Sequence, residues 1–592
     1  MTVLEYALPL IIIVMLAFPL GLYIAKVMNP ATVLPRFFHR VESFLYKMMG
    51  VNREEEMDWK KYLAGVLVLS LFSFVVLFAM CMLQGYLPGN PNGAENMSWD
   101  LAFNTAISFV TNTNWQSYSG EAQMSYLTQA LGLTVQNFLS AAIGISVMFA
   151  VVRGFARKNT RVLGNFWVDI TRITLYVLLP LSFVLSIILI SQGVVQSGSG
   201  NILVQLLEPI VIDSSGNAVV GANVIDGVAY LNGVVLENIS IITKTFVPQG
   251  LAASQIAIKM LGTNGGGFFG ANSAFPLENP NWLSNLLEMV SILLIPCALV
   301  FSFGREVKDQ KQGRALFLTM GIMIIGALIV VACFEHIGVS IINDNESILS
   351  IFGNIEGKEM RFGTSNSVIW AVFTTAASNG SVNAMHDSFT SMGGLVLMAL
   401  MQIGEIVFGG VGSGMYGMLA FVIMTVFIAG LMVGRTPEYL GKKIEPNEMR
   451  WSVIAVLATP VAILVGSGIA VLVPDISQYL TNSGPHGFSE ILYAFSSAGA
   501  NNGSAFAGLM SDTTFLNLSL GLCMVFGRFV PIVAMLKVAD GLSIKKRIAT
   551  TSGTLSTTSP MFVFLLITII FLVGALSFFP AWSLGPIAEY FQ

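Results

Sequence analysis

Charged residues are scarce in this sequence. They make up only 10% of its 592 residues, and hydrophobic residues make up 54%. An ordinary soluble domain has roughly 25% charged residues. A chain with so little charge cannot cover the surface of a soluble protein of this length, so the composition excludes that class and indicates an integral membrane protein.

Cysteine and histidine are also few, with four residues of each. The cysteines have neither CxxC nor Cys/His spacing, which excludes a disulfide framework and a cysteine-based metal site: they are Cys81, Cys297, Cys333 and Cys523. The adjacent pair His386 and Asp387 is expected to be hydrogen-bonded architecture, because no nucleophile or second carboxylate lies in register with it. We interpret the remaining histidines as loop or interface residues: His39, His336 and His486.

The sequence lacks the GxxxxGK[ST] phosphate-binding loop and has no soluble segment large enough for a nucleotide-binding or phosphorylation domain. The chain is therefore not expected to be an enzyme by itself. If it takes part in active transport, the energy must enter through another chain or through an ion gradient.

Long apolar runs are abundant. Ten of them approach or exceed the length of about 20 residues that crosses a bilayer: 4–25, 62–83, 124–152, 166–191, 282–303, 314–333, 391–430, 452–473, 513–538 and 560–580. We therefore predict an all-α membrane protein. Five segments hold 24 of the 29 Lys and Arg residues: 26–61, 153–172, 304–314, 431–450 and 537–547. The positive-inside rule places these segments in the cytoplasm, and both termini are therefore expected outside. The outer segments 192–250 and 334–366 are predicted to form short strands or an irregular cap.

Between these runs, a short helical segment followed by an Asn, Gly, Ser or Thr cluster occurs four times, at 102–120, 251–270, 368–387 and 488–508. One such cluster is ordinarily a turn. Four copies in the same relation to flanking helices favour membrane-pore-membrane repeats around a central pore like that of a potassium channel. By eye, the clusters align as Thr111-Asn112-Thr113-Asn114, Thr263-Asn264-Gly265-Gly266, Ser378-Asn379-Gly380-Ser381 and Asn501-Asn502-Gly503-Ser504.

The predicted organisation follows from these repeats. Because each repeat begins and ends in the cytoplasm, the four are parallel. The parts are an N-terminal helix and basic segment (1–61), repeat 1 (62–152), repeat 2 with an outer insertion at 192–250 (166–303), repeat 3 with a broken second helix (314–430), repeat 4 (452–538) and a C-terminal helix (539–592).

The clusters have the chemistry of a cation filter. A dehydrated alkali cation needs a ring of oxygens, which backbone carbonyls supply where the loop can turn them inward. The predicted filter residues either free the backbone or offer side-chain oxygens and support: Asn112, Thr113, Gln116, Thr263, Asn264, Gly265, Gly266, Ser378, Asn379, Gly380, Asn502 and Gly503. No loop contains the TVGYG run of fast potassium channels, so we expect a short filter suited to capture.

Three further features lie at membrane depth. Within the run MQIGEIVFGGVGSGMYGM, four glycines in six residues would break a helix: Gly409, Gly410, Gly412 and Gly414. This break indicates a gate or a cavity lining, or else a close contact between helices. Arg528 lies roughly 13 Å from the cytoplasmic end of its helix and would oppose straight passage of a cation, although it could also snorkel to the surface. Glu405 is an intramembrane carboxylate that either lines the ion path or pairs with a basic group.

Several long motifs resemble one family. They are TNTNWQSYSGE from Thr111, LGTNGGGFFGANSAFPLENP from Leu261, VNAMHDS from Val382, GEIVFGGVGSGMYGM from Gly404 and ANNGSAFAGL from Ala500. Together they resemble the potassium-binding subunit (KdpA) family of the Kdp potassium-transporting ATPase, within the superfamily of potassium transporters. The resemblance covers essentially the whole chain.

The resemblance implies that the chain selects external potassium in a filter and passes it through an intramembrane tunnel to a P-type ATPase subunit that uses ATP. It implies two small accessory subunits, a bacterial cell membrane, and no cofactor beyond the transported K⁺. Membrane lipid is an expected partner and nucleic acid is not. The implied ion ligands are Asn112, Gln116, Thr263, Gly265, Asn379 and Gly503, with Arg528 blocking the cytoplasmic exit and 409–414 forming the loop below the filter. At Asn379 the family pattern has cysteine, so an amide oxygen there could alter ion discrimination.

Two other functions fit parts of the sequence. A channel or ion-coupled uptake protein of the Trk/Ktr/HKT type shares the four-repeat plan, but the full-length motif match and the extra first and last helices favour the pump subunit. A proton-coupled carrier would need carboxylates or histidines stacked through the membrane, and such residues are scarce.

Overall fold

The computed structural model describes residues 3–29, 32, 36–225, 227–337, 353–434, 436–548 and 555–592. In this part of the chain, 10 helices are long and apolar enough to cross a membrane. They are α1 (Val3–Met28), α3 (Trp59–Leu83), α6 (Val135–Ala156), α7 (Phe166–Ile173) continuing into α8 (Leu179–Ser191), α10 (Trp282–Glu306), α11 (Gln310–Ile337), α15 (Ser413–Val433), α16 (Pro446–Val471), α18 (Thr514–Ile544) and α19 (Pro560–Leu584). The prediction of a mostly helical chain with ten such helices is confirmed.

The predicted seventh span, 391–430, is broken in the structure. It consists of α14 (Ser391–Gln402), which is too short to cross a bilayer, and α15, with the non-helical segment 403–412 between them. Glycines and left-handed backbone interrupt the helix here, as Gly404, Glu405, Phe408, Gly409 and Gly412 all have positive φ.

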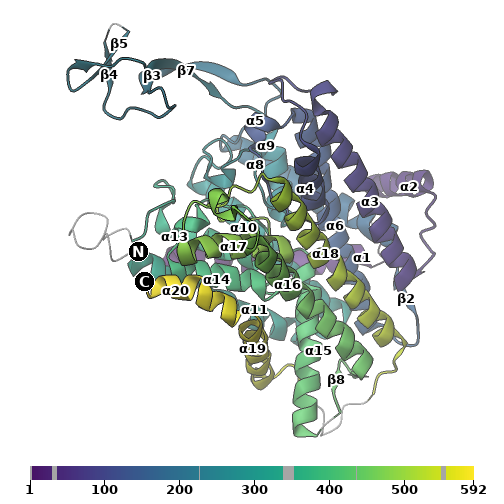
Figure 1. The fold of residues 1–592 in the computed structure, drawn as a ribbon. Coiled ribbons are helices and arrows are strands. Elements are labelled where there is room, and N and C mark those ends of the chain that lie inside the picture. Colours follow the sequence, from purple (N-terminus) through teal and green to yellow (C-terminus); the bar gives the residue numbers. More distant parts are fainter. Residues whose placement is uncertain are drawn as a thin grey trace.

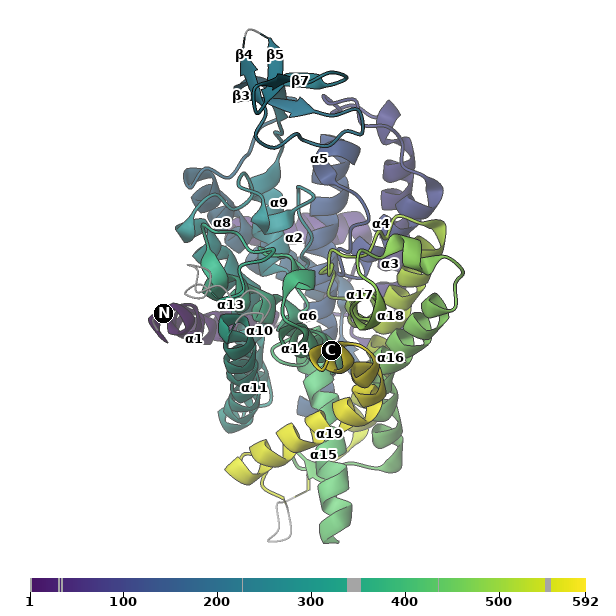
Figure 2. The same cartoon turned by 60° about the vertical axis from the view of Figure 1, so that its left-hand side comes forward.

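Four shorter helices end in the polar clusters found in the sequence. They are α4 (Trp99–Val110), α9 (Ala252–Leu261), α13 (Gly363–Ala376) and α17 (Gly484–Ala500). All four are largely buried, and each packs against at least one membrane-crossing helix, as α4 and α17 do against α18 (Figures 1 and 2).

The central helices differ from the peripheral ones in burial. Most residues of α6 and α10 are buried within the chain, whereas only a minority of the residues of α1 and α3 are buried. Helix α1 packs along α10, and α16 packs along α18. The exposed residues of the peripheral helices include many large apolar side chains, as expected where a helix faces lipid.

The insertion at 192–250 forms strands, as predicted. Strands β3 (Ile202–Ile212) and β7 (Ser240–Val247) pair in an antiparallel ribbon, and β4 (Asn223–Ile225), β5 (Val228–Leu231) and β6 (Val234–Val235) form a second small sheet. This arm projects beyond the helical body (Figures 1 and 2). In the other outer segment, 334–366, α11 extends to Ile337 and 353–362 is irregular, while 338–352 lies outside the described residues.

The remaining elements are short. At the end predicted to be cytoplasmic, the amphipathic helix α2 (Arg36–Met49) is joined to α7 by the buried Arg172–Glu42 ion pair (3.0 Å). The other strands and α-helices are β1 (Met57–Asp58), β2 (Val162–Gly164), β8 (Glu438–Tyr439), β9 (Lys442–Lys443), α5 (Gly120–Gln123) and α20 (Pro586–Tyr590). The 3₁₀ helices are η1 (Gln84–Tyr86), η4 (Asn272–Ala274), η5 (His386–Ser388) and η6 (Ile476–Tyr479). Two π-helical segments, η2 (Thr128–Thr134) before α6 and η3 (Thr174–Leu178) between α7 and α8, continue the membrane-crossing helices.

Candidate ion-binding site

The four polar clusters share one backbone conformation. In each, two residues with positive φ flank a central residue: Asn112 and Asn114, Thr263 and Gly265, Ser378 and Gly380, and Asn501 and Gly503. The central residue donates its N–H to a carbonyl five residues earlier, in the bonds Thr113 to Ser108, Asn264 to Lys259, Asn379 to Thr374 and Asn502 to Ser497. We call residues 112–114, 263–265, 378–380 and 501–503 the four-loop ring and number its loops in chain order.

This shared conformation corrects the alignment made from the sequence. Thr113, and not Asn112, is the counterpart of Asn264, Asn379 and Asn502. The first loop was therefore placed one residue out of register. The error arose because Asn114 occupies the left-handed position that glycine occupies in the other three loops, and asparagine is one of the few residues that adopts it readily.

The loops close into a ring through contacts between neighbours. A Cβ atom on Gly265 would overlap the carbonyl oxygen of Asn379 in the third loop. In the same way, Gly380 abuts Asn502 of the fourth loop and Gly503 abuts Thr113 of the first. These three junctions place backbone directly against backbone, and only glycine leaves the room.

The fourth junction, between the first and second loops, is made by side chains. Asn112 Nδ2 donates to the carbonyl of Thr263 at 2.8 Å. Asn114 Nδ2 donates to the carbonyl of Gly265 at 3.0 Å and to Asn137 Oδ1 at 2.9 Å. Each loop thus contacts its neighbours on both sides.

At the central position, the carbonyl of every loop remains available for a ligand. No described residue donates a hydrogen bond to the carbonyl oxygens of the central residues Thr113, Asn264, Asn379 and Asn502. Buried backbone carbonyls are nearly always paired, so four equivalent exceptions in one ring are unusual. Hard, neutral oxygens of this kind are the ligands that a dehydrated potassium ion needs.

The predicted side-chain ligands brace the ring. Asn112 Oδ1 accepts hydrogen bonds from Asn264 Nδ2 (2.6 Å) and Ser140 Oγ (2.8 Å). The amide of Gln116 spans Gly267, accepting from its N–H (2.8 Å) and donating to its carbonyl (2.9 Å). These amides therefore fix loop positions, and their oxygens are already engaged.

Asn379 behaves in the same way. Its Oδ1 accepts from the N–H of Ser381 (3.1 Å) and from the Ser381 hydroxyl, and its Nδ2 donates to the carbonyl of Lys259 (3.0 Å). The Asn379 amide is therefore engaged at both ends, its oxygen within its own loop and its nitrogen on α9, while no described residue donates a hydrogen bond to its backbone carbonyl.

A cavity of about 50 Å³ lies beside the ring, lined by Glu405, Ser413, Tyr416, Asn501 and Arg528, together with apolar residues of α15, α16 and α18. Glu405 Oε1 accepts a hydrogen bond from Asn502 Nδ2 at 2.7 Å, and Arg528 Nη2 donates to the carbonyl of Ser140 at 3.3 Å. The volume is sufficient for a few water molecules or a small cation. Arg528 is buried, so its guanidinium does not reach the surface of the chain.

The glycine-rich segment makes close backbone contacts. Gly409 abuts Gly414, which lies within α15, and Gly412 abuts Gly144 of α6. A Cβ on Gly410 would lie 3.2 Å from Ser378 Cβ in the third loop. None of the four predicted glycines lines the cavity described above, whose polar wall comes from their neighbours. The segment is joined to the ring by a hydrogen bond from the Val411 N–H to Thr263 Oγ1 (2.9 Å).

Comparison with known proteins supplies the family. Residues 7–591 match the model of the KdpA family, described as the potassium-transporting ATPase A subunit. The chain belongs to the KdpA family. It is 59% identical over 596 residues to the "potassium-transporting ATPase potassium-binding subunit" of Clostridium perfringens, and 56% identical to the protein of the same name from Clostridium botulinum. Each alignment covers 100% of this chain and 99% of the relative.

Among solved structures, the potassium transporter TrkH from Vibrio parahaemolyticus is similar, with 13% sequence identity and a TM-score of 0.49. The match covers 88% of this chain and 96% of TrkH.

Sequence reasoning missed one buried cation next to the ring of this KdpA-family chain. Lys259 on α9 is fully buried, and its Nζ donates to the carbonyl of Gly266 at 2.9 Å. A signal was present, because Lys259 is one of only five Lys or Arg residues outside the basic segments. Its partner Glu278 lies 19 residues further along the chain and could not be paired with it by spacing.

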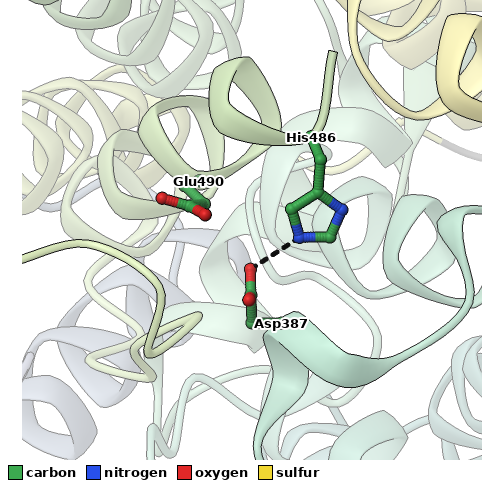
Figure 3. Close-up of side chains that lie close together, drawn as sticks. All are labelled: Asp387, His486 and Glu490. Atoms are coloured by element: carbon green, nitrogen blue, oxygen red, sulfur yellow. Dashed lines mark hydrogen bonds and ion pairs between the residues drawn. The ribbon is translucent and has the colours of Figure 1, made fainter. Parts of the chain in front are cut away.

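A charged cluster lies at the start of α17, where His486 faces Asp387 of η5 (Figure 3). His486 Nε2 is 2.8 Å from Asp387 Oδ1, and His486 Nδ1 is 2.9 Å from Glu589 Oε1 on α20. Burial acts to lower the pKa of His486, but the hydrogen bonds to Asp387 and Glu589 outweigh it and raise the pKa to about 10. The imidazolium thus joins three distant segments.

Glu490, beside this cluster (Figure 3), accepts four hydrogen bonds from Thr481 and Asn482. These bonds engage both carboxylate oxygens, so the cluster works as a hydrogen-bonded clamp and not as a cation site. His386 contacts Tyr493 Oη at 2.7 Å, and burial, followed by the charge of Lys358, lowers its pKa to about 3. Both observations agree with the architectural interpretation of His386 and Asp387, although carboxylates from distant segments do lie nearby.

Proposed function

We propose that this chain is the potassium-binding subunit of an ATP-driven potassium uptake pump and that the four-loop ring is its ion-selective site. The observation that carries the proposal is the ring of four carbonyls at Thr113, Asn264, Asn379 and Asn502, to which none of the described residues donates a hydrogen bond. Such carbonyls replace the hydration shell of K⁺ without the cost of burying a compensating negative charge. The names of the relatives support the same ion and the same assembly.

The ring fits four parallel membrane-pore-membrane repeats around one pore. Each loop follows a short buried helix and is succeeded by a membrane-length segment, except in the third repeat, where that segment is broken. In this arrangement the termini and the β3–β7 arm lie outside a bacterial cell membrane. One tier of equivalent carbonyls suits capture of scarce K⁺ better than rapid conduction.

From the ring, we propose that the ion moves sideways. The buried Arg528 opposes a cation that continues straight along the pore, because a guanidinium in a low-dielectric site repels it strongly. The cavity containing Glu405 and Arg528 opens a route between α15, α16 and α18. At its end a P-type ATPase subunit would take the ion and hydrolyse ATP, with small accessory subunits completing the complex.

Vesicle transport tests this function. The chain is reconstituted alone, and in parallel with its presumed ATPase partner, and uptake of K⁺ or Rb⁺ is measured with and without ATP. The proposal expects uptake only with partner and ATP, together with K⁺-stimulated ATP hydrolysis. Gradient-driven flux through the chain alone would instead make it a Trk/Ktr/HKT-type channel or carrier.

A further inference from the structure

Behind the second loop lies a buried cluster of charge centred on Lys259. The Lys259 side chain is 1% exposed and that of Glu278 is fully buried, and Lys259 Nζ forms an ion pair with Glu278 Oε1. Lys259 Nζ also donates to the carbonyl of Gly266 at 2.9 Å and lies 3.4 Å from Ser273 Oγ. A lysine in such a place is expensive unless paired, so its position calls for an explanation.

Glu278 holds the other side of the same loop. Its Oε2 accepts hydrogen bonds from the N–H groups of Phe268 (3.1 Å) and Phe269 (3.3 Å). Lys259 and Glu278 together therefore fix the backbone from Gly266 to Phe269, immediately after the ring. Charge-assisted hydrogen bonds of this kind are stronger and more directional than neutral ones.

The carbonyl at the position of Gly266 also accepts a side-chain hydrogen bond in the first and third loops. The position three residues after the first left-handed residue is Trp115 in the first loop, Gly266 in the second and Ser381 in the third. Trp115 O accepts from Ser108 Oγ at 2.9 Å, and Ser381 O accepts from Trp370 Nε1 at 2.8 Å. The donors in those loops are neutral, whereas the second loop uses an ammonium group.

We infer that Lys259 is a positioning residue for ion selectivity, which holds the Gly266 carbonyl away from the pore so that this oxygen does not meet the ion. This inference rests on the proposed function. Once released, the Gly266 carbonyl is free to turn inward, since Gly266 itself has positive φ and no side chain to restrain it. An added mobile oxygen would then let the site contract around the smaller Na⁺ and reduce its preference for K⁺.

The test must separate positioning from the cost of an unpaired buried charge. Lys259→Met alone leaves Glu278 without its partner, so the informative variant is Lys259→Met/Glu278→Gln, which removes both charges of the ion pair. The other carboxylate that acts on Lys259, that of Glu288, stays in place in this variant with its hydrogen bond from Ser273 Oγ (2.9 Å). The chain offers a matched control in Lys358→Met/Glu335→Gln, because Lys358 and Glu335 form a second buried pair at 2.9 Å with no contact to a ring carbonyl among the described residues. Each double variant is purified in complex with the ATPase partner, and the KM for K⁺ and for Na⁺ is measured from stimulated ATP hydrolysis.

We expect the Lys259 double variant to lose about tenfold in its K⁺ over Na⁺ preference, the size expected for a hydrogen bond to a charged group, while the Lys358 control keeps the wild-type ratio. A wild-type ratio in the Lys259 double variant would overturn the inference. Failure of that variant alone to assemble would also overturn it, by showing a structural role. A wild-type complex without K⁺ stimulation would instead refute the proposed function, so the two failures are distinguishable.

Discussion

Distant segments of this chain meet in two places that are built differently. In the four-loop ring, backbone lies directly against backbone, so that Gly265, Gly380 and Gly503 leave no space for a single additional carbon. In the outer clamp, Asp387, His486 and Glu589 meet through charged side chains. The first kind of contact fixes atoms rigidly, and the second depends on protonation.

The difference matches what each place must do. A carbonyl ring discriminates between ions of similar chemistry only if its oxygens stay in position, and glycine contacts achieve this because a packed backbone cannot adjust gradually. The outer clamp only has to keep α20 against α17 and the third loop. Side chains with adjustable rotamers and charge are sufficient for that purpose.

The largest expected effect comes from adding one methyl group to the ring. Gly265→Ala would push a Cβ into the carbonyl of Asn379 and place alanine at φ +76, a backbone strain of about 1–3 kcal/mol before the overlap is counted. We expect the KM for K⁺ in stimulated ATP hydrolysis to rise at least about tenfold, or the complex to fail to assemble.

Gly321→Ala on α11 is the matched control, because a Cβ there would meet nothing within 4 Å. It should behave as wild type in the same assay. A Gly265→Ala complex with normal K⁺ affinity and selectivity would show that the ring is not the ion site.

The ring also shows how far sequence reasoning reached. The four loops were located correctly because Asn-Gly and Ser-Gly clusters after short helices are visible in the sequence. The register of the first loop was wrong because the left-handed conformation of Asn112 and Asn114 is not visible in residue identity. From the residues alone, the amide of Asn379 could either brace its loop or offer an oxygen, and the resemblance to the family implied that Asn379 and Gln116 are ion ligands. Residue identity cannot tell a side chain that faces the pore from one that braces its own or a neighbouring loop, whereas the hydrogen bonds of both amides can.

An intermediate effect is expected at the one junction where no ring glycine abuts the neighbouring loop. Asn114→Gly keeps the left-handed backbone but removes the hydrogen bonds to the carbonyl of Gly265 and to Asn137. Only the bond to the Gly265 carbonyl crosses the junction, and such a bond contributes about 0.5–1.5 kcal/mol, so the KM for K⁺ should rise about threefold to tenfold. Asn159→Gly, at an exposed left-handed turn (φ 54), is the control and should have no effect.

If Asn114→Gly instead binds K⁺ as tightly as wild type, the first and second loops would be held well enough by Asn112 alone. The comparison between glycine and asparagine junctions would then lose its functional meaning. A loss as severe as that of Gly265→Ala would mean that all four junctions are equally rigid.

Buried charge was the other limit of sequence reasoning. Arg528 was identified as an intramembrane charge from its depth in a helix, whereas Lys259 and Lys358 were only counted among the basic residues outside the cytoplasmic segments. The partners of these lysines, Glu278 and Glu335, are 19 and 23 residues away along the chain. No periodicity relates such positions, so the pairs emerge only from the folded arrangement.

The smallest effect is expected at the outer clamp and should depend on pH. The folded-state pKa of His486, about 10, lies above the usual value of about 6.5. The stabilisation is therefore complete below about pH 6.5 and is lost as the pH rises through about 10. In purified complex, the Tm should fall between about pH 7 and about pH 10 as α20 detaches, and proteolysis near the C-terminus should increase.

His486→Gln lacks the imidazolium and should show a flatter pH profile at a lower starting Tm, whereas His39→Gln at an exposed position should follow wild type. An equal pH slope in wild type and His486→Gln would contradict a charge-based clamp, since the loss would then come from groups elsewhere in the complex.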